Sequence, residues 1–558
     1  MYSKTKVKIN QSKIQKVLPI IPMVYLQDLK VINQTYISKI QSERVMTYSL
    51  VIGILSLIGG LLAMMLVKDL IWLLRSIKYI KQGIPVRYFP FLGYAKHLDN
   101  PEKEIGQEDL HQLFQNPKNK NQTEKLIMTN GPKTEPTIFL NDKDLIKEFF
   151  QKETQVSYTD NTIAFPAAKA FTFDIDPHSV QKARAIYAEI FFPKNLKKHT
   201  PQIRAIIQRH LDRIKQEIKQ KTEGNNNQPE IEVKRFLKDI FEEMVSFILF
   251  GGEIPKLDGV ILVNQIDKVI GGFFNNMKSP LNILTLGVST KLGLDSEFNQ
   301  IKELYRRIIE VLIEVIKKRD SSEDYEFGSN AVDLLILKKR QLEAQGKADL
   351  AMTYEVIAQN VFTMIFAGVD TTRNLTESSL YHLSKEKELQ QQLRETIRKE
   401  VLDTGRGEDY DKYDNSPMLD MFIAEALRVY TPASMSFHRK ISKTFKLGQY
   451  TIYKGDHLIV SYVTVLKKPE LFGRASRFDL EKYEDTKRIK DLSKSALIPF
   501  SVGKRACIGK NLADIMVKMI LSNFLDQFEL EKSNEPNRRF MEFTVGLKHC
   551  RARVRSLN

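Results

Sequence analysis

The chain has 558 residues, of which 42% are hydrophobic and 27% charged, a size and balance that fit one large folded domain with accessory segments. Two cysteines, Cys507 and Cys550, exclude a disulfide framework and a cysteine-rich zinc site, and the nine scattered histidines contain no paired metal-binding motif. The net charge of +17 favours an anionic membrane surface or an acidic protein partner, because no RNA-binding, zinc-finger or basic-zipper pattern indicates nucleic acid.

The N-terminal region is predicted to hold a basic extension, residues 1–44, and a transmembrane anchor, residues 45–67. The anchor segment carries no charged side chain, and as a helix it spans about 35 Å, enough for a hydrocarbon core of ~30 Å. A buried core helix and a cleaved signal peptide are the alternatives, although the segment lacks a clear small-residue cleavage site. Both flanks are basic, so charge leaves the orientation open. Met46 is a candidate start of translation, which would remove the extension.

The rest of the chain is predicted as a linker followed by one main domain. Residues 68–93 are basic and end in a hinge rich in proline and glycine, and residues 94–558 form the domain. Most of the domain has apolar residues at helical spacing, whereas residues 450–460 alternate like a strand hairpin that turns at Lys454 and Gly455. The expected fold class is therefore mainly α with a minor β-sheet region.

A long helix is predicted over residues 353–383, interrupted by small residues at its centre. Ala367 and Gly368 precede Asp370 and Thr371 there, and a glycine inside a helix costs about 1 kcal/mol relative to alanine. Small side chains let a helix approach a ligand closely, and an acid beside a hydroxyl can relay protons into the gap. Taken alone, a helix cap or a glycine kink with a surface aspartate is the favoured interpretation of the segment.

A further helix is predicted to begin at Ser416 and Pro417, a capping hydroxyl followed by a proline at the first helical position. Glu425 and Arg428 lie three residues apart on one face of this helix, where a guanidinium can bind both carboxylate oxygens. Surface pairs of this kind are common and contribute only about 0–1 kcal/mol, so the spacing by itself is a weak signal.

Residues 500–509, which read FSVGKRACIG, prepare one cysteine to act as an anionic ligand for iron. Cys507 precedes an apolar-periodic run, residues 509–528, that predicts a helix with one buried stripe. At the turn into a helix, unpaired N–H groups and the positive end of the dipole favour a thiolate over a thiol. Gly503 frees the loop backbone, and Gly509 permits close approach to a flat ligand. Without these neighbours, a buried structural thiol is the simpler interpretation.

These ten residues match the pattern F-x-x-G-x-R-x-C-x-G, so from about residue 84 onward the sequence resembles the cytochrome P450 family. Residues 367–372 and 425–428 match that family's A-G-x-[DE]-T-[TS] and E-x-x-R patterns. The resemblance implies the cytochrome P450 fold after a single transmembrane helix, and a haem-thiolate monooxygenase acting on an apolar substrate. The alternatives are an isomerase or dehydratase that needs no reductase, against which Asp370 and Thr371 argue, and a non-catalytic haem-binding membrane protein.

The resemblance also implies roles for single residues. Cys507 is the expected axial thiolate of haem b, Thr371 the expected hydrogen-bond partner of bound dioxygen, and Asp370 the expected source of protons. The implied cofactor-binding residues are Phe500, Gly503, Arg505, Gly509, Arg439, Arg184, Ala367 and Gly368.

The three arginines of that set are candidates to hold the haem propionates, ranked Arg505, Arg439 and then Arg184. Arg184 ranks last because Val180 replaces the tryptophan of the family's W-x-x-x-R pattern. Glu425 and Arg428 are the implied structural pair behind the haem. Their third partner is normally an arginine, and here Lys482, Arg477 or no residue fills that role.

The resemblance further implies NADPH–cytochrome P450 reductase, a diflavin protein, and cytochrome b5 as electron donors, with O2, a small apolar substrate and membrane lipid as other partners. The implied location is the endoplasmic reticulum membrane, single-pass, with the catalytic domain facing the cytosol. Residues 157–173 and 433–437 are expected to line the substrate pocket, and the apolar residues 280–288 are either a membrane-dipping loop or core. Four lysines near the cysteine loop are expected to dock the flavin domain, a solvated face being the alternative: Lys494, Lys504, Lys510 and Lys518.

Overall fold

The structure, a computed structural model, places the chain in two compact units, Met1–Val67 and Lys68–Asn558. It describes residues 51–53, 55–56, 59–60, 62–89, 114–116, 119–131, 134–159, 170, 177–222, 229–252, 255–279, 282, 285, 287–322, 330–347, 352–403, 409–475, 477–483, 486–494, 496–533, 538–541 and 544–557.

In the first unit, the described residues between 51 and 67 are helical. Most of their apolar side chains are exposed, as at Val51, Ile52, Leu55 and Leu62, whereas Met65 is buried. The extension and much of the anchor segment lie outside the described residues. Among the residues that are described, no helix combines the length and the apolar character needed to cross a bilayer.

The second unit contains a six-stranded sheet in the order β1-β4-β5-β13-β10-β6. The sheet joins strands from the start of the domain to strands more than 300 residues later, because β13 pairs in parallel with β5 and antiparallel with β10. Its central strands are buried along their whole length, which fits their continuous apolar runs. The strands are β1 Val86–Arg87, β4 Leu126–Asn130, β5 Pro136–Leu140, β6 Ser157–Thr159, β10 Arg439–Ile441 and β13 His457–Val460.

Residues 68–80 form a helix that is hydrogen-bonded to this sheet region. The Trp72 indole donates to the carbonyl of Thr129 over 3.3 Å, and the Tyr79 hydroxyl donates to Asp456 over 2.7 Å. Lys78, one of the basic residues after the apolar segment, forms an ion pair of 2.6 Å with the same Asp456. At least part of the basic charge beyond the anchor segment therefore fixes a helix to the domain.

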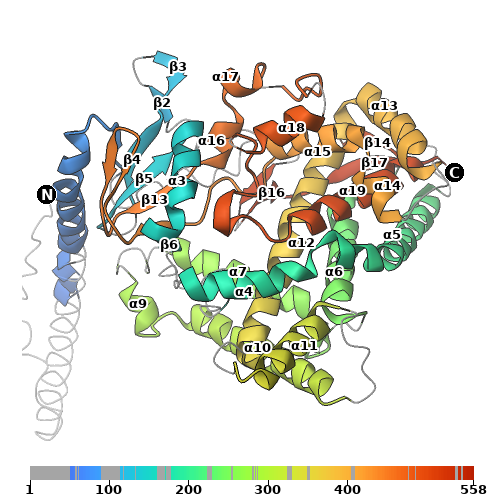
Figure 1. Cartoon of the computed structure of the whole chain (residues 1–558), viewed down its shortest axis with the longest axis horizontal. Helices are drawn as coiled ribbons and strands as arrows, with labels where there is room; N and C mark the ends of the chain where they lie inside the picture. Colours follow the sequence, from blue (N-terminus) through green and yellow to red (C-terminus); the bar gives the residue numbers. More distant parts are fainter. Residues whose placement is uncertain are drawn as a thin grey trace, which may run out of the picture. The chain divides into compact units, whose positions relative to one another are not determined.

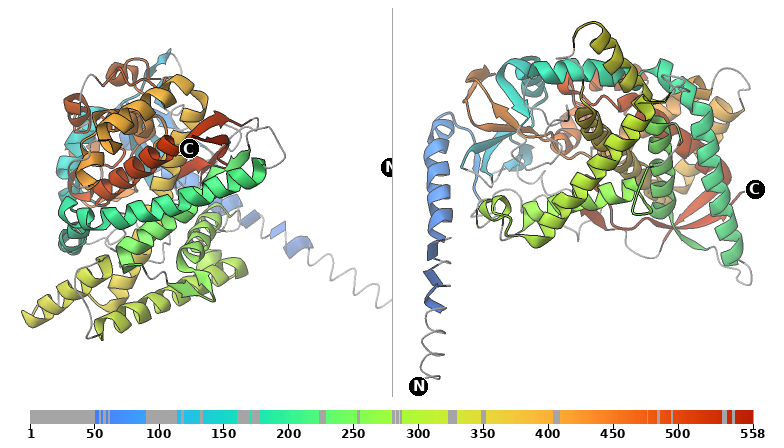
Figure 2. Two further views of the ribbon diagram at one scale, coloured as in Figure 1. Left: turned by 90° about the vertical axis from the view of Figure 1, so that its right-hand side faces the viewer. Right: turned by 90° about the horizontal axis from the view of Figure 1, so that it is seen from below.

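Most of the helices gather at the other end of the second unit, whereas α3 lies beside the sheet (Figures 1 and 2). The long helix α12, Tyr354–Lys385, packs against α6, Val233–Phe250, α10, Ser296–Asp320, and α19, Lys510–Gln527. The other helices are α3 Lys143–Val156, α4 Pro177–Ile190, α5 Pro193–Thr222, α7 Leu262–Lys278, α9 Val288–Lys291, α11 Ala331–Ala344, α13 Lys387–Ile397, α14 Asp409–Asp414, α15 Pro417–Val429, α16 Tyr462–Leu466, α17 Pro469–Phe472 and α18 Thr486–Leu492, with a π-helical turn Arg398–Leu402 and a 3-10 turn Gly503–Arg505.

Small sheets complete the fold. A three-stranded sheet pairs the C-terminal strand with both neighbours in the order β14-β17-β7, and the hairpin β15-β16 lies against α12. The remaining strands are β2 Gln115–Asn116, β3 Asn119–Thr123, β7 Glu230–Glu232, β8 Lys256–Leu257, β9 Val260–Ile261, β11 Phe445–Leu447, β12 Tyr450–Ile452, β14 Phe528–Lys532, β15 Arg539–Met541, β16 Val545–Leu547 and β17 Arg551–Ser556. The mainly α class with minor sheets is confirmed.

The predicted starts of two helices agree with the structure. The Thr353 side chain caps α12 by accepting from the Val356 N–H, and Ser416 caps α15 with Pro417 at its first position. The predicted interruption of α12 is wrong. The helix is continuous from Tyr354 to Lys385, and the hydroxyls of Thr371 and Thr372 donate to the carbonyls one turn earlier without breaking it.

The predicted hairpin over residues 450–460 is also wrong. Strand β12 pairs with the preceding strand β11 through a turn at Gly448, where φ is 54°. Strand β13 leaves at Gly455 and enters the six-stranded sheet instead. All four residues of β13 are buried, so this strand gains more burial in the interior of the large sheet than as the edge of a hairpin.

Candidate active site

The loop before α19 holds Cys507 in a fixed turn. The Cys507 N–H donates to the carbonyl of Phe500 over 2.8 Å, and the Ala506 N–H donates to that of Gly503 over 3.1 Å. Gly503 has φ of 78°, and a Cβ there would lie 3.3 Å from the backbone oxygen of Phe150 in α3. Glycine is therefore required at position 503 both for its backbone conformation and for the close approach of α3.

The Cys507 side chain has accessible surface. The protein atoms packed around the sulfur nevertheless desolvate it, which raises the pKa of the thiol. The Gly509 N–H donates to the sulfur and, with the charges of Arg184 and Lys510, favours the thiolate without offsetting burial. The donor set thus fits a sulfur that becomes anionic when a cation binds it, as an axial ligand of haem iron does.

The three candidate arginines occupy different elements. Arg184, on α4, donates to the carbonyl of Ala506 and so reaches the cysteine loop directly. Arg505 is half-buried in the 3-10 turn of the loop itself, and Arg439 is 4% exposed on β10. Arg184, the candidate with the weakest sequence motif, therefore has a direct hydrogen bond to the loop. The ranking of the three arginines as propionate partners stays a prediction.

At its centre, the largely buried helix α12 has a face made of small side chains. Ala367 is exposed although Phe366 and Val369 are buried. The half-buried Thr371 hydroxyl donates to the Ala367 carbonyl over 2.8 Å, so it keeps its lone pairs to accept a further hydrogen bond. Gly368 faces α6, since a Cβ there would lie 3.4 Å from Val245.

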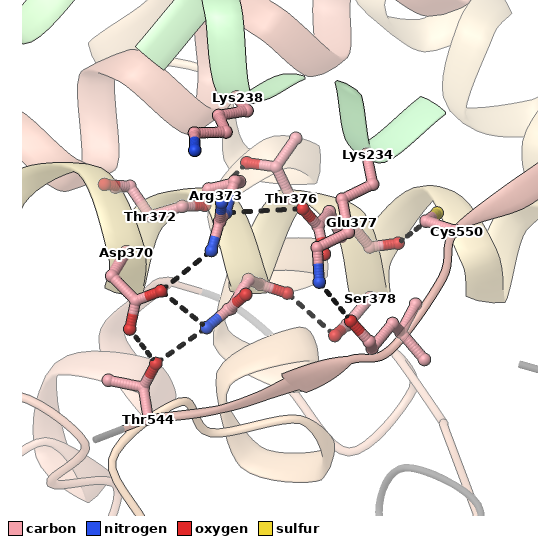
Figure 3. A network of polar contacts seen from close by, with 12 residues as sticks. Lys234, Lys238, Asp370, Thr372, Arg373, Thr376, Glu377, Ser378, Thr544 and Cys550 are labelled. Atoms are coloured by element: carbon pink, nitrogen blue, oxygen red, sulfur yellow. Dashed lines mark hydrogen bonds and ion pairs between the residues drawn. The ribbon is translucent and has the colours of Figure 1, made fainter. Parts of the chain in front are cut away.

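Asp370 is held by three partners (Figure 3). Its Oδ1 accepts from the Arg373 guanidinium over 2.9 Å and from the Asn374 amide over 3.4 Å, and its Oδ2 accepts from the Thr544 hydroxyl. The Asn374 amide also donates to the Thr544 hydroxyl over 2.7 Å. Thr544 was missed by sequence reasoning, and no local signal marks it, because it lies 174 residues along the chain from Asp370.

Glu425 and Arg428 form a fully buried pair on α15. The guanidinium donates from Nε and Nη2 to the two carboxylate oxygens over 2.7 and 2.8 Å, and both side chains are 0% exposed. Arg428 also donates to the carbonyls of Leu466, Ala475 and Arg477 over 3.1, 2.7 and 2.7 Å. One side chain therefore joins α15 to two backbone segments through three carbonyls.

Comparison with known proteins decides the family. The family model described as Cytochrome P450 matches residues 85–554, most of the chain. The chain belongs to the cytochrome P450 family. Members of this family bind haem b through a cysteine thiolate and are in general haem-thiolate monooxygenases. The cytochrome P450 fold is confirmed, and the Cys507 loop carries the donor set that such a ligand needs.

Three similar proteins illustrate the match. Cytochrome P450 709B3 of Arabidopsis thaliana is 24% identical over 311 residues, which span 55% of this chain and 57% of that protein, little more than half its length. Cytokinin hydroxylase of Arabidopsis thaliana is 26% identical over 416 residues, or 72% of this chain and 75% of that protein. The crystal structure of the cytochrome P450DA heme domain has a TM-score of 0.68 at 17% identity, and the match covers 85% of this chain and 97% of that one.

In this cytochrome P450, Lys482 completes the network around Glu425. Its ammonium lies 2.9 Å from Oε1, which also accepts from the Asp479 N–H over 2.8 Å, and the Tyr483 hydroxyl donates to Oε2 over 3.0 Å. Arg477, the other candidate, contributes its backbone carbonyl to Arg428. Burial lowers the pKa of Lys482, and its contact with Glu425 opposes that shift.

The docking role expected of Lys518 is wrong. Its side chain is 1% exposed, and it forms ion pairs of 2.6 and 2.9 Å with Asp420 and Asp514, which join α19 to α15. Lys504 and Lys510 are exposed beside Cys507, as expected for a docking surface.

The regions expected to meet substrate or membrane are only partly described. Residues 157–159 form strand β6 at the edge of the large sheet, and residues 160–169 and 171–173 lie outside the described part of the chain. In residues 433–437, Ser434 and Ser436 are buried and Phe437 is exposed. Most of residues 280–287 lie outside the description, whereas Val288 and Leu292 at α9 are exposed.

Proposed function

We propose that this cytochrome P450 inserts one atom of O2 into a small apolar substrate, with electrons passed from NADPH by a diflavin reductase. The observation that carries the proposal is the Cys507 loop, in which the sulfur accepts the Gly509 N–H and lies near two cations. Bound haem supplies dioxygen activation, to which a thiolate contributes electron density. Relatives within the family support the same general reaction.

The residues of the chain have separate parts in this proposal. Cys507 ligates the iron, with Phe500, Gly503 and Gly509 fixing its loop, and the arginines of the site hold the propionates. Ala367 leaves room beside α12, where the Thr371 hydroxyl offers lone pairs and the neighbouring Asp370 carboxyl serves to relay protons toward it. An isomerase or dehydratase needs no such acid–hydroxyl pair, so the pair favours the monooxygenase.

The proposal predicts that Cys507→Ala abolishes the red-shifted Soret band of the reduced carbon monoxide complex. The matched control is Cys550→Ala, which removes a buried thiol near Glu377 and leaves the axial donor intact. A normal band in the Cys507 variant, or loss of the band in the Cys550 variant alone, contradicts the ligand assignment. Reductase-dependent consumption of NADPH and O2 by the wild-type protein then separates a monooxygenase from an isomerase.

We also propose that residues 45–67 anchor the protein in the endoplasmic reticulum membrane, single-pass, with the catalytic domain facing the cytosol. The uncharged run and the exposed apolar residues of its described part support this. The exposed Lys504 and Lys510 suit an acidic reductase or cytochrome b5.

The double substitution Leu55→Arg and Leu62→Arg is expected to release the protein from carbonate-washed microsomes. Each arginine within a membrane span costs about 2.5–3.5 kcal/mol of insertion free energy. The control is Leu292→Arg, which places the same charge on an apolar side chain that is 68% exposed outside the anchor segment. Wild-type protein in the soluble fraction, or a double variant that stays bound, contradicts the anchor. Digestion of the domain by protease added to sealed microsomes tests the orientation.

A further inference from the structure

A second acidic residue lies on α12 one turn beyond the acid–hydroxyl pair. Arg373 stands between Asp370 and Glu377: its Nη2 donates to Asp370 over 2.9 Å, and its Nε lies 3.4 Å from Glu377 Oε1 (Figure 3). The guanidinium is 12% exposed, so both contacts are made largely out of water. One cation is thus shared by two carboxylates, of which the proposed reaction uses only Asp370.

Arg373 is the cation in ion-pair contact with Glu377, which has few other groups to stabilise its charge. The Glu377 side chain is 0% exposed, and neither carboxylate oxygen has a hydrogen-bond donor among the described residues. A buried carboxylate in this position is costly unless a cation balances it. Arg373 is the nearest such cation. The charge state of Glu377 and the strength of the ion pair between Arg373 and Asp370 therefore depend on each other.

We propose that Arg373 and Glu377 are positioning residues that set how firmly Asp370 is held away from its proton-delivering position. The inference rests on the proposed monooxygenase function and on Asp370 as its proton source. When Glu377 is neutral, the guanidinium interacts with Asp370 alone and holds it. When Glu377 is ionised, it competes for the same guanidinium, and Asp370 is freer to rotate toward Thr371.

The other two partners of Asp370 do not respond to charge in this way. Thr544 and Asn374 are neutral, and Asn374 lies close against β16, because a Cβ at Gly546 would come within 2.4 Å of its Oδ1. Among these partners, Arg373 is therefore the one whose interaction with Asp370 weakens when Glu377 becomes charged.

The surroundings of Glu377 bring the titration of its carboxyl to near-neutral pH. Burial raises the pKa of Glu377 to about 7, with Arg373 and Lys234 opposing the shift and Asp370 and Glu232 adding to it. A carboxyl with a raised pKa stays neutral until the pH exceeds it. Arg373 accordingly holds Asp370 tightly below about pH 7 and less tightly above it.

Further charged groups face Arg373 from α6 and α7. Lys238 forms contacts of 2.9 Å with Asp267 and 3.5 Å with Glu242, and both acids favour the charged form of Arg373. Burial raises the pKa of Glu242 to about 7 as well, but its ion-pair partner is Lys238. Glu242 is therefore a matched control, a buried carboxyl that titrates in the same range without an ion pair to Arg373.

The first experiment does not depend on turnover. Infrared difference spectra of the full-length haem-loaded protein, titrated through neutral pH, are expected to show a protonated-carboxyl band that fades near pH 7. Glu377→Gln removes one component of this band, and Arg373→Gln moves the midpoint of that component to higher pH. A midpoint unchanged by Arg373→Gln overturns the shared cation.

The second experiment measures NADPH consumption without added substrate, at saturating diflavin reductase, together with its solvent deuterium isotope effect. In the wild type the rate is expected to rise severalfold through pH 7, whereas Glu377→Gln keeps the low-pH rate and a large isotope effect at every pH. Glu242→Gln retains the rise. An intact reduced carbon monoxide spectrum shows that each variant is folded.

Asp370→Asn separates the two proposals. If it leaves rate and isotope effect unchanged, the proton-delivery role of Asp370 fails, and the positioning role fails with it even where the infrared shift is found. If Asp370→Asn slows consumption while Glu377→Gln keeps the wild-type pH profile, the function stands and the positioning role is overturned.

Discussion

Arg428→Ala is expected to lower the free energy of unfolding by about 3–5 kcal/mol, because it leaves the charge of Glu425 buried with a weaker set of partners. Lys482 and Tyr483 still contact that carboxylate, but three backbone carbonyls lose the donor that joins them to α15. Urea unfolding of the haem-loaded protein, followed by circular dichroism and by haem absorbance, measures the effect.

The chain provides a matched control for this prediction. Glu303 and Arg306 on α10 repeat the same E-x-x-R spacing, with a similar bidentate contact, but both side chains are more than half exposed. Arg306→Ala is expected to leave the unfolding midpoint close to that of the wild type, since water and salt screen exposed pairs. Equal effects of the two substitutions would show that burial is not what makes Arg428 important.

This comparison also shows what spacing alone can predict. The sequence contains at least two E-x-x-R pairs on helices, and the local pattern is the same in both. The cytochrome P450 motifs single out Glu425 and Arg428, but burial comes from packing by α16 and by residues 475–483. The choice of Lys482 over Arg477 follows from that packing, which no local periodicity encodes.

Helix positions were predictable because their signals are local. Thr353, Ser416 and the residues around Gly509 mark helix starts, and the observed helices begin within one residue of them. Strand partners were not predictable in this way. The residues of β13 could have paired with β12, and the partners they have instead, β5 and β10, include one more than 300 residues away.

The charge of a side chain was the least reliable basis for predicting whether that side chain is exposed. Lys518 was expected at a docking surface, yet it is buried and balanced by carboxylates of its own helix and of α15. A sequence specifies which side chains are charged, but their partners are set by how helices pack. The same limit explains why Thr544 escaped notice, since its hydroxyl reaches Asp370 only through the position of the β15-β16 hairpin.

Thr371→Ala is expected to divert electrons from productive turnover to hydrogen peroxide. Removing a group that positions a proton typically costs about 10²-fold or more, so peroxide should account for most of the NADPH consumed. The assay measures peroxide released per NADPH with the reductase present and needs no identified substrate. An unchanged peroxide fraction would contradict the role of Thr371.

Thr372→Ala is the control that isolates this role from helix stability. The Thr372 hydroxyl also donates to the carbonyl four residues earlier, so both substitutions remove the same kind of bond from the same turn of α12. The two hydroxyls differ in position, because Thr372 is 3% exposed and Thr371 is half-buried on the face that includes Ala367. If α12 only needed the capped carbonyls, the two variants would release equal fractions of peroxide. A large increase confined to Thr371→Ala assigns the effect to the hydroxyl that can reach bound dioxygen.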